Sequence, residues 1–408
     1  MKILLINKFF YNRGGAERWL FEVDRFLRDQ GHETVYFSMR DDNNVPSPWN
    51  EYFVSPVSYT QSPFSPASLK AILRMFYSGE VNRAIERLIK DTRPDIALLG
   101  NVYHQLGPSL IHSLARHRIP MIMMLHDYKV VCPSYLMFRR GRPCEKCARG
   151  RFFWSAIHGC GGSRVRGCVL ALESYWQKNI VKSYSKIATF IAPSRFLADN
   201  ANEMGFTHPI QHVPNFVSIP TCKADTANGR AVGFAGRISP EKGLRILINA
   251  AAMATDIPVR IAGTGPSLEE LKQLASPNVT FVGQLDKESL VQEMLTWRAA
   301  VIPSLWYENS PYSILEAMAL GLPVIGSDAG GISELLNGRG ILFPAADAKA
   351  LARAIHELWG NLKRCKQLGD TGREFIRIQH SKEKFISVLL PVLEKTLSTA
   401  RGKVVSQA

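Results

Sequence analysis

Seven residues separate Glu308 from Glu316, and the Ser310-Pro311 pair between them is typical of a helix start. Ser310 is expected to cap the helix, and Pro311 to be its first residue. A helix start offers unpaired N–H groups and a positive dipole end, which suit a phosphate. Two acids beside such a site favour a ligand that also carries hydroxyls or a developing positive charge, as a nucleotide sugar does. The alternative is an ordinary amphipathic helix with two solvated acids.

A second group suited to a phosphate lies around Ser239-Pro240, where another helix start is expected. Arg237 and Lys242 bracket this point. Arginine can bind a phosphate through two hydrogen bonds, and lysine acts as a point charge. Because cations are unfavourable beside a helix start, a ligand explains them better than a structural role does.

Glycine turns follow two of the predicted strands. Gly14 and Gly15 follow the first strand, where open α/β sheets bind ligands, although the pair is not a G-x-G-x-x-G fingerprint. Gly263 and Gly265 follow a later strand and could leave room for a base and a ribose. Either pair could also be a simple turn.

His126 follows a predicted strand over residues 120–125 and is itself followed by Asp127. Polar side chains at the carboxyl end of a strand lie where ligands gather in such sheets. His126 is therefore a candidate site residue in the first half of the chain. The alternative is a capped turn in which His126 bonds to the backbone.

Residues 128–168 are predicted to be a long insertion rich in cysteine and basic residues. Cys144 and Cys147 have the C-x2-C spacing of a zinc knuckle, and Cys132 and Cys160 would have to complete the site. Cys132 and Cys160 do not form a second C-x2-C element. Reduced cysteines in an ordered basic loop are the favoured interpretation, so we predict no metal.

The 408 residues predict two domains, because a single core rarely grows past about 250–300 residues. A charge of +15 attracts nucleic acid, anionic lipid or phosphorylated ligands. The motifs of RNA-binding modules are missing, so nucleic acid is not expected. The longest apolar run, residues 119–125, is too short to span a bilayer, and the first ten residues are too soon interrupted for a secretory signal. A cytoplasmic protein is expected.

Two basic segments of the first half suggest an anionic membrane surface as a partner. Residues 139–151 contain six basic side chains and one acid, and residues 68–90 are expected to form one basic amphipathic helix. The alternatives are a solvated basic face and a helix that covers its own sheet.

Strand–turn–helix units recur along the chain and predict parallel, doubly wound sheets in an α/β fold. We expect a first Rossmann-like domain over residues 1–216, a linker over 217–229 and a second domain over 230–380. Residues 381–408 are expected to form a terminal helix.

The E-x7-E element of Glu308 and Glu316, with the Arg237 and Lys242 element before it, resembles the family 4 retaining glycosyltransferases of the GT-B fold. The resemblance implies two Rossmann-type domains that face a central cleft, with the last helix packed back on the first domain. It implies that Arg237 and Lys242 hold the donor's diphosphate, that Glu308 lies near the donor sugar as a catalytic residue, and that Glu316 binds the ribose. No metal or other cofactor is then expected.

The resemblance extends to further residues. Ser310, Pro311 and Tyr312 are assigned to donor binding, together with Gly263 and Gly265. Gly14 and Gly15 are assigned to a loop on the acceptor side, and His126 to a catalytic position near the transferred sugar or the acceptor.

The implied function is transfer of a sugar from a UDP- or GDP-sugar to a glycan or polyprenyl-linked acceptor, with retention of configuration. The implied setting is assembly of a bacterial surface polysaccharide (lipopolysaccharide, capsule or exopolysaccharide) at the inner face of the membrane. The alternatives are a nucleotide-sugar epimerase of the same fold and a non-catalytic protein that binds nucleotide sugars.

Overall fold

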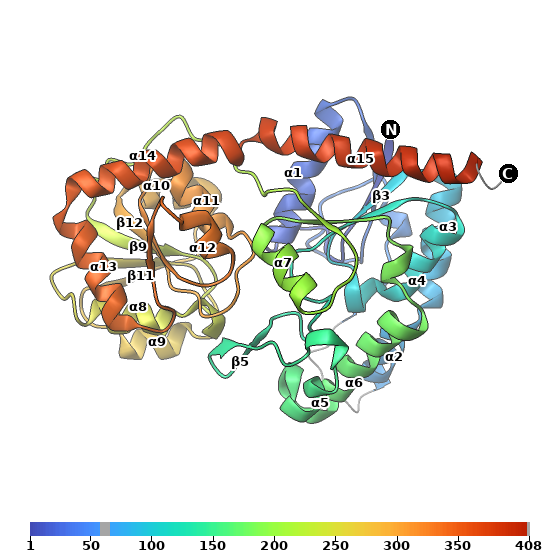
Figure 1. Cartoon of the computed structure of the whole chain (residues 1–408), viewed down its shortest axis with the longest axis horizontal. Helices are drawn as coiled ribbons and strands as arrows, with labels where there is room; N and C mark the ends of the chain where they lie inside the picture. The colour runs from blue at the N-terminus through green and yellow to red at the C-terminus, as the bar shows by residue number, and fades with distance from the viewer. Residues whose placement is uncertain (58–65, 406–408) are drawn as a thin grey trace.

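The computed structural model describes residues 1–57 and 66–405 and contains two parallel six-stranded sheets with helices packed against them (Figure 1). The strand order is β2-β1-β3-β4-β7-β8 in the first sheet and β11-β10-β9-β12-β13-β14 in the second. In each sheet the order reverses beside the first strand of the domain, which creates the switch point where such sheets bind ligands. The predicted fold of two doubly wound Rossmann-type domains is confirmed.

The first domain also contains the insertion, with its short hairpin β5–β6 and several single-turn helices. Its strands are β1 (Lys2–Ile6), β2 (Glu33–Phe37), β3 (Ile96–Leu99), β4 (Met121–Met124), β5 (Phe138–Arg139), β6 (Arg142–Pro143), β7 (Thr189–Ala192) and β8 (Ile210–His212). Its helices are α1 (Gly15–Asp29), α2 (Pro66–Phe76), α3 (Gly79–Thr92), α4 (Tyr103–Arg116), α5 (Trp154–His158), α6 (Arg164–Tyr175) and α7 (Arg195–Glu203).

The second domain follows residues 213–230, which contain no helix or strand. Its strands are β9 (Ala231–Ala235), β10 (Val259–Ala262), β11 (Val279–Gly283), β12 (Trp297–Ile302), β13 (Val324–Ser327) and β14 (Ile341–Phe343). Its helices are α8 (Leu244–Ala251), α9 (Leu268–Leu274), α10 (Lys287–Leu295), α11 (Tyr312–Ala319), α12 (Gly331–Leu336), α13 (Ala348–Gly360) and α14 (Leu362–Gln379), and α15 (Lys382–Val405) ends the chain.

Strand β1 illustrates why these apolar runs become central strands. Leu4 and Ile6 belong to one buried cluster, whereas Ile3 and Leu5 belong to another on the opposite face of the sheet. Successive side chains of a strand point to opposite faces, so a run without polar interruption is stable only where both faces are covered.

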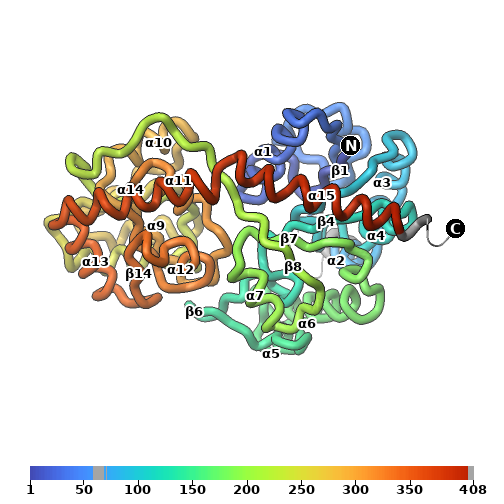
Figure 2. The backbone as a smooth tube through the Cα atoms, turned by 45° about the horizontal axis from the view of Figure 1, so that its top comes forward, coloured from blue at the N-terminus to red at the C-terminus, as the bar shows by residue number. Residues whose placement is uncertain are grey.

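Helices α14 and α15 run one after the other along both domains (Figure 2). Phe385, Leu389 and Leu393 of α15 are buried among the side chains of the first domain. Thr396 Oγ1 lies 2.8 Å from Thr189 Oγ1 of strand β7. The last helix therefore packs on the first domain, although it follows the second in sequence.

The single helix expected over residues 68–90 is wrong. The helix is interrupted at Tyr77 and Ser78. Ser78 caps α3 by accepting a hydrogen bond from Val81 N at 3.2 Å. A serine followed by glycine favours a new helix start over continuation of the previous helix. Residues 58–65, and residues 406–408 of the expected terminal helix, lie outside the described residues. No helix in the described parts of the chain is both long and apolar enough to cross a bilayer.

Candidate active site

A cavity of about 960 Å³ lies between the two domains, at the carboxyl ends of the central strands of both sheets. It brings together most of the residues that the sequence singled out. The predicted residues that line it are Gly15, His126, Arg237, Lys242, Glu308, Ser310, Pro311, Tyr312 and Glu316. Gly14, Gly263 and Gly265 are not among its lining residues.

Two of the four charged residues of the second domain that were expected to meet a ligand, Lys242 and Glu308, bind each other. Lys242 Nζ lies 2.6 Å from Glu308 Oε1, and Ser304 Oγ donates a hydrogen bond to the same oxygen at 2.7 Å. Glu308 is 5% exposed. Burial opposes its ionisation, but Lys242 and Ser304 hold the pKa of Glu308 below its ordinary value. The site therefore contains a buried, ionised carboxylate with one adjacent cation.

The backbone before α8 explains this position of Lys242. The expected α-helix start at Ser239-Pro240 is wrong: residues 240–242 form a single 3-10 turn, and α8 begins at Leu244. Gly243 separates them with φ of 68°, and a Cβ there would lie 2.0 Å from Pro303 O. The close approach that glycine permits brings Lys242 to the loop that carries Glu308.

The start of α11 also differs from the prediction. The helix begins at Tyr312, and Pro311 is its cap residue with φ of −69° and ψ of 124°. Ser310 is not the side-chain cap. Its Oγ is buried and has no hydrogen-bond partner among the described residues. The helix start therefore presents a hydroxyl as well as N–H groups beside the cavity, and both can donate to an anion.

Glu316 reaches across the cavity to the first domain. Arg18 of α1 forms an ion pair with Glu316, and its guanidinium lies 4.4 Å from the centre of the Tyr312 ring. Gly15 lies at the same contact, since a Cβ there would be 3.4 Å from Tyr312 Cδ2. Gly15 of the first domain therefore lies against Tyr312 of the second where the two domains meet.

His126 is half-buried at the cavity wall. Its ring packs edge-on against Trp19 at 5.2 Å, and its Nε2 has no partner in the described part of the chain. Burial, and then the charge of Lys8, lower the pKa of His126 to about 3, so the imidazole is neutral. The turn that follows is held by Asp127, whose Oδ1 accepts from Lys129 N at 2.9 Å, so His126 is not needed as a cap.

Gly263 and Gly265 were expected to leave room for the donor, but they pack against the protein itself. A Cβ at Gly263 would lie 1.9 Å from Gly236 O, and one at Gly265 would lie 2.2 Å from Ile238 O. These glycines allow the loop after β10 to lie against the loop that carries Arg237. Their position favours a role in supporting that loop.

Cys132, Cys144, Cys147 and Cys160 of the insertion are free thiols, and Cys132 and Cys147 are buried. Within residues 1–57 and 66–405, no group of three or more His, Cys, Asp or Glu side chains is arranged to hold a metal ion. Burial first, followed by Cys132, Cys160 and Cys144, raises the pKa of the Cys147 thiol. The thiols therefore lie within electrostatic reach of one another.

Several residues that connect the domains were not identified from the sequence. Asn309 Nδ2 donates to His126 O at 2.6 Å, and Glu334 accepts from the backbone N of Phe196 at 2.9 Å. Arg18 belongs with them. In the sequence, only the position of Asn309 next to Glu308 indicated a role at the site. Arg18 and Glu334 look like ordinary residues on a helix surface.

The arrangement is suited to an anionic leaving group. Lys242, the exposed Arg237 and the start of α11 all lie on the second domain's side of the cavity. Positive groups that are already in place can stabilise charge that develops on a departing phosphate. The neutral His126 and the backbone around Gly15 face them from the first domain.

Comparison with known proteins supports this description. The model of Glycosyltransferase Family 4 matches residues 13–219, and that of Glycosyl transferases group 1 matches residues 229–361. A protein encoded in the cps region of Klebsiella pneumoniae is 22% identical over 353 residues, covering 82% of this chain and 87% of that protein. The lipopolysaccharide core biosynthesis glycosyltransferase LpsE of Rhizobium meliloti is 26% identical, and the match covers 48% of this chain and 61% of LpsE.

Solved structures share the fold over almost the whole chain. Sucrose-phosphate synthase from Thermosynechococcus elongatus has a TM-score of 0.70 at 18% identity, covering 98% of this chain and 99% of that one. The Anabaena protein HepE, in complex with UDP, has a TM-score of 0.69 at 17% identity, and the match covers 97% of this chain and 100% of that one. Since a family model accounts for half of the sequence and the fold agrees, this chain belongs to Glycosyltransferase Family 4 and is a glycosyltransferase of the GT-B fold.

Proposed function

We propose that this protein transfers a sugar from a UDP- or GDP-sugar to a glycan or lipid-linked acceptor, with retention of anomeric configuration. The observation that carries the proposal is the ion pair between half-buried Lys242 and buried Glu308 at the cavity wall, 2.6 Å between Nζ and Oε1. A ligand with a diphosphate and a sugar matches a site in which cations and an ionised carboxylate lie side by side. The family membership and the UDP named in the HepE complex support this donor class.

In the proposed reaction, the bond between the sugar and the diphosphate breaks through an oxocarbenium-like state. Arg237, Lys242 and the start of α11 neutralise the departing diphosphate. Glu308 lies near the sugar and stabilises the positive charge that develops there. Glu316 binds the ribose, and Arg18 must then exchange its partner. The proposal includes no metal and no other cofactor.

The acceptor is proposed to bind on the first domain, whose side of the cavity includes an apolar part formed by α2 and α6. Ile72 and Met75 of α2 face the cavity together with Val169 and Leu170 of α6. A lipid-linked acceptor would suit this wall better than a free sugar would. The names of relatives, LpsE and the cps-region protein, support surface polysaccharide assembly as the setting.

A peripheral position at the inner face of the membrane is part of the proposal. Helices α2, α5 and α6 lie together at one end of the first domain (Figure 1), and Trp176 Nε1 donates to Phe76 O at 3.2 Å between α2 and the turn after α6. Large apolar side chains are exposed on these three helices and at the cap of α5, namely those of Leu69, Leu73, Phe153, Ile157, Val165 and Leu172. Lys146 of the basic segment 139–151 lies near this end, with its Nζ 5.9 Å from the centre of the Trp154 ring of α5. Apolar side chains and basic residues together favour an anionic bilayer.

Nucleotide release from a panel of UDP- and GDP-sugars, measured with and without acceptor, tests the proposal. A transferase releases nucleotide faster when an acceptor is added, and NMR of the product then reads its anomeric configuration. An epimerase would convert the donor without any acceptor. Protein that neither converts nor releases any donor would support the alternative of a non-catalytic binding protein.

A further inference from the structure

Two cations of the first domain lie at the cavity without a carboxylate in contact with them. Lys8 and Arg13 belong to the loop between β1 and α1, and both line the cavity. Lys8 Nζ lies 5.4 Å from the centre of the Phe9 ring, and Arg13 Cζ lies 4.3 Å from the same centre. Within residues 1–57 and 66–405, neither side chain forms a hydrogen bond or an ion pair. The donor's diphosphate is assigned to cations of the second domain, which leaves Lys8 and Arg13 without an assigned ligand.

Hydrogen bonds fix the loop that carries the two cations. Lys8 N donates to Asn101 O at 2.9 Å. Asn7 Nδ2 donates to Phe9 O at 2.8 Å and to Glu17 Oε1 at 3.1 Å. The end of β1 is thereby tied to α1 and to the loop after β3. A site that is ordered before its ligand arrives binds with a smaller entropy cost.

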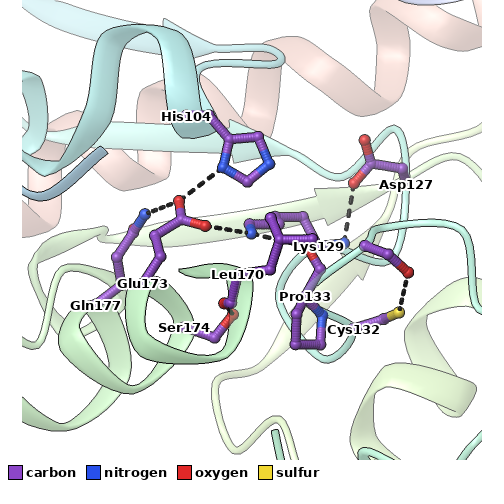
Figure 3. Close-up of polar contacts among 10 residues, drawn as sticks. His104, Asp127, Lys129, Cys132, Pro133, Leu170, Glu173, Ser174 and Gln177 are labelled. Atoms are coloured by element: carbon purple, nitrogen blue, oxygen red, sulfur yellow. Dashed lines mark hydrogen bonds and ion pairs between the residues drawn. The ribbon is translucent and has the colours of Figure 1, made fainter. Parts of the chain in front are cut away.

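A second lysine of this domain shows how the fold neutralises a cation that has only a structural role. Lys129 Nζ is buried and lies 2.7 Å from Glu173 Oε2 and 3.0 Å from Pro133 O (Figure 3). Asp127 is engaged with the same residue, since its Oδ1 accepts from Lys129 N at 2.9 Å (Figure 3). Lys8, by contrast, is half-buried and has no carboxylate bonded to it among the described residues.

The electrostatics of Lys8 favour a further anion. Burial lowers the pKa of Lys8, the charges of Asp127 and Glu17 oppose this, and the charge of Arg13 adds to it. The two acids thus affect Lys8 from a distance, and each is hydrogen-bonded to another group. An anion placed between Lys8 and Arg13 would offset the desolvation of the lysine and the repulsion between the two cations.

We propose that Lys8 and Arg13 bind a phosphate group of the acceptor, so that the acceptor is a sugar joined to a lipid through a phosphate or a diphosphate. This inference rests on the proposed function and names the acceptor class of the same site. Lysine provides a point charge, and arginine can donate two parallel hydrogen bonds to a phosphate. The apolar side chains of α2 and α6 at the same cavity, such as Ile72 and Leu170, suit the lipid. A free sugar would use neither feature.

A phosphate of the donor is the alternative occupant, because the charges of both Arg13 and Arg237 reach Tyr135 of the insertion. The measurement therefore uses full-length protein saturated with UDP or GDP, whichever binds more tightly, so that the donor's phosphates are already in place. The probes are the n-octyl glycosides of glucose, galactose, mannose and N-acetylglucosamine. Each is compared with its counterpart that has a phosphodiester between the sugar and the octyl chain.

Calorimetry should give a Kd about tenfold lower for the phosphodiester of the best-bound sugar than for its uncharged counterpart, as expected for one charge-assisted contact. Lys8→Met keeps most of the stem and should remove most of this difference. Arg13→Met should reduce it less, because Arg13 is exposed. Neither variant should change the Kd of the uncharged glycoside or of the nucleotide. Lys90→Met and Arg25→Met, at exposed positions outside the cavity, are the matched controls.

Equal Kd values for the charged and uncharged glycosides in unsubstituted protein would overturn the inference, and this comparison needs no variant to fold. Weaker binding of the nucleotide to Lys8→Met or Arg13→Met would also overturn it, because the cations would then belong to the donor site. The same holds if inorganic phosphate alone binds as tightly as the phosphodiester, since the site would then not select an acceptor.

Failure of the proposed function would give a different result. No nucleotide would then be released from any donor, with or without the glycosides, whereas the charged glycoside would still bind in a way that depends on Lys8 and Arg13. Release of nucleotide that is stimulated by the phosphodiester, and less so in Lys8→Met than in Lys90→Met, would support both proposals together.

Discussion

Replacement of Lys242 by methionine tests the centre of the site. The change keeps most of the stem that lies beside Trp306, where Nζ is 5.4 Å from the ring centre, and removes the charge. Glu308 then stays buried without its cation. Breaking a fully buried pair costs about 3–5 kcal/mol. Lys242 keeps 23% of its side chain exposed, so we expect a loss of about 2 kcal/mol in the free energy of unfolding of the second domain.

The same change should lower kcat/KM for the donor. One charge-assisted contact to the leaving group contributes about 1.5–3 kcal/mol in the transition state, or about 10- to 150-fold in rate. Donor kcat/KM and urea unfolding are measured for the Lys242→Met protein, with Lys363→Met, at an exposed position, as the control.

The free energy of unfolding that is lost in Lys242→Met should depend on pH in a definite direction. In the native protein the pKa of Glu308 lies below its ordinary value, so the ionised carboxylate stabilises the fold above that value and the contribution is lost at lower pH. In Lys242→Met burial dominates and raises the pKa of Glu308. The difference in stability between the two proteins is therefore greatest at neutral pH, and it shrinks as the pH falls through the ordinary range of a glutamate.

A double variant separates stability from catalysis. Lys242→Met with Glu308→Gln removes both charges, so it should recover most of the stability lost in the single variant but none of the turnover. The reasoning is refuted if Lys242→Met protein has an unchanged donor kcat/KM. It is also refuted if the double variant is no more stable than the single one.

Three further outcomes are expected. Glu308→Gln alone should lower kcat more than it weakens donor binding, because the charge acts mainly in the transition state; normal turnover would show that Glu308 is only structural. The protein should co-sediment with anionic vesicles at low salt and dissociate near molar salt, and Arg139, Arg140 and Arg142 changed together to glutamine should weaken that binding while a soluble acceptor analogue is still turned over. No sedimentation at low ionic strength would indicate a soluble acceptor. Because the pKa of His126 is lowered to about 3, the unfolding free energy should fall by up to about 1.4 kcal/mol per pH unit between pH 6.5 and 3, and His126→Gln should remove this slope.

Much of the fold could be predicted from the sequence because the signals are local. The uninterrupted apolar strands, such as β1, are typical of a sheet covered on both faces, and glycine turns punctuate the strand ends. Arg237, Lys242, Glu308 and Glu316 could be named because charged residues beside strand ends and helix starts have few structural explanations. Nine of the twelve residues assigned to the site line one cavity.

The errors came from competition between local signals that are similar in strength. Ser310 and Ser239 both precede a proline and resemble helix caps, yet neither side chain caps its helix. In both cases the backbone conformation is set by packing against another loop, as where Gly243 lies against Pro303. The assignment of Gly263 and Gly265 to the ligand had a different cause. A glycine in the sequence indicates that something lies close to the backbone, but not whether this is a ligand or, as here, another loop of the protein.

Only the tertiary structure decides which charges meet. Lys242 and Glu308 are 66 residues apart, and Arg18 and Glu316 are 298 apart. Glu173 reads in the sequence as an ordinary acid on a helix, and it becomes a buried anion only because α6 packs over Lys129 and His104. Desolvation and ion pairing depend on every element that surrounds a side chain. The sequence therefore determines which residue types are present. Their partners, burial and pKa values are determined only by the folded arrangement of the two domains around the cavity.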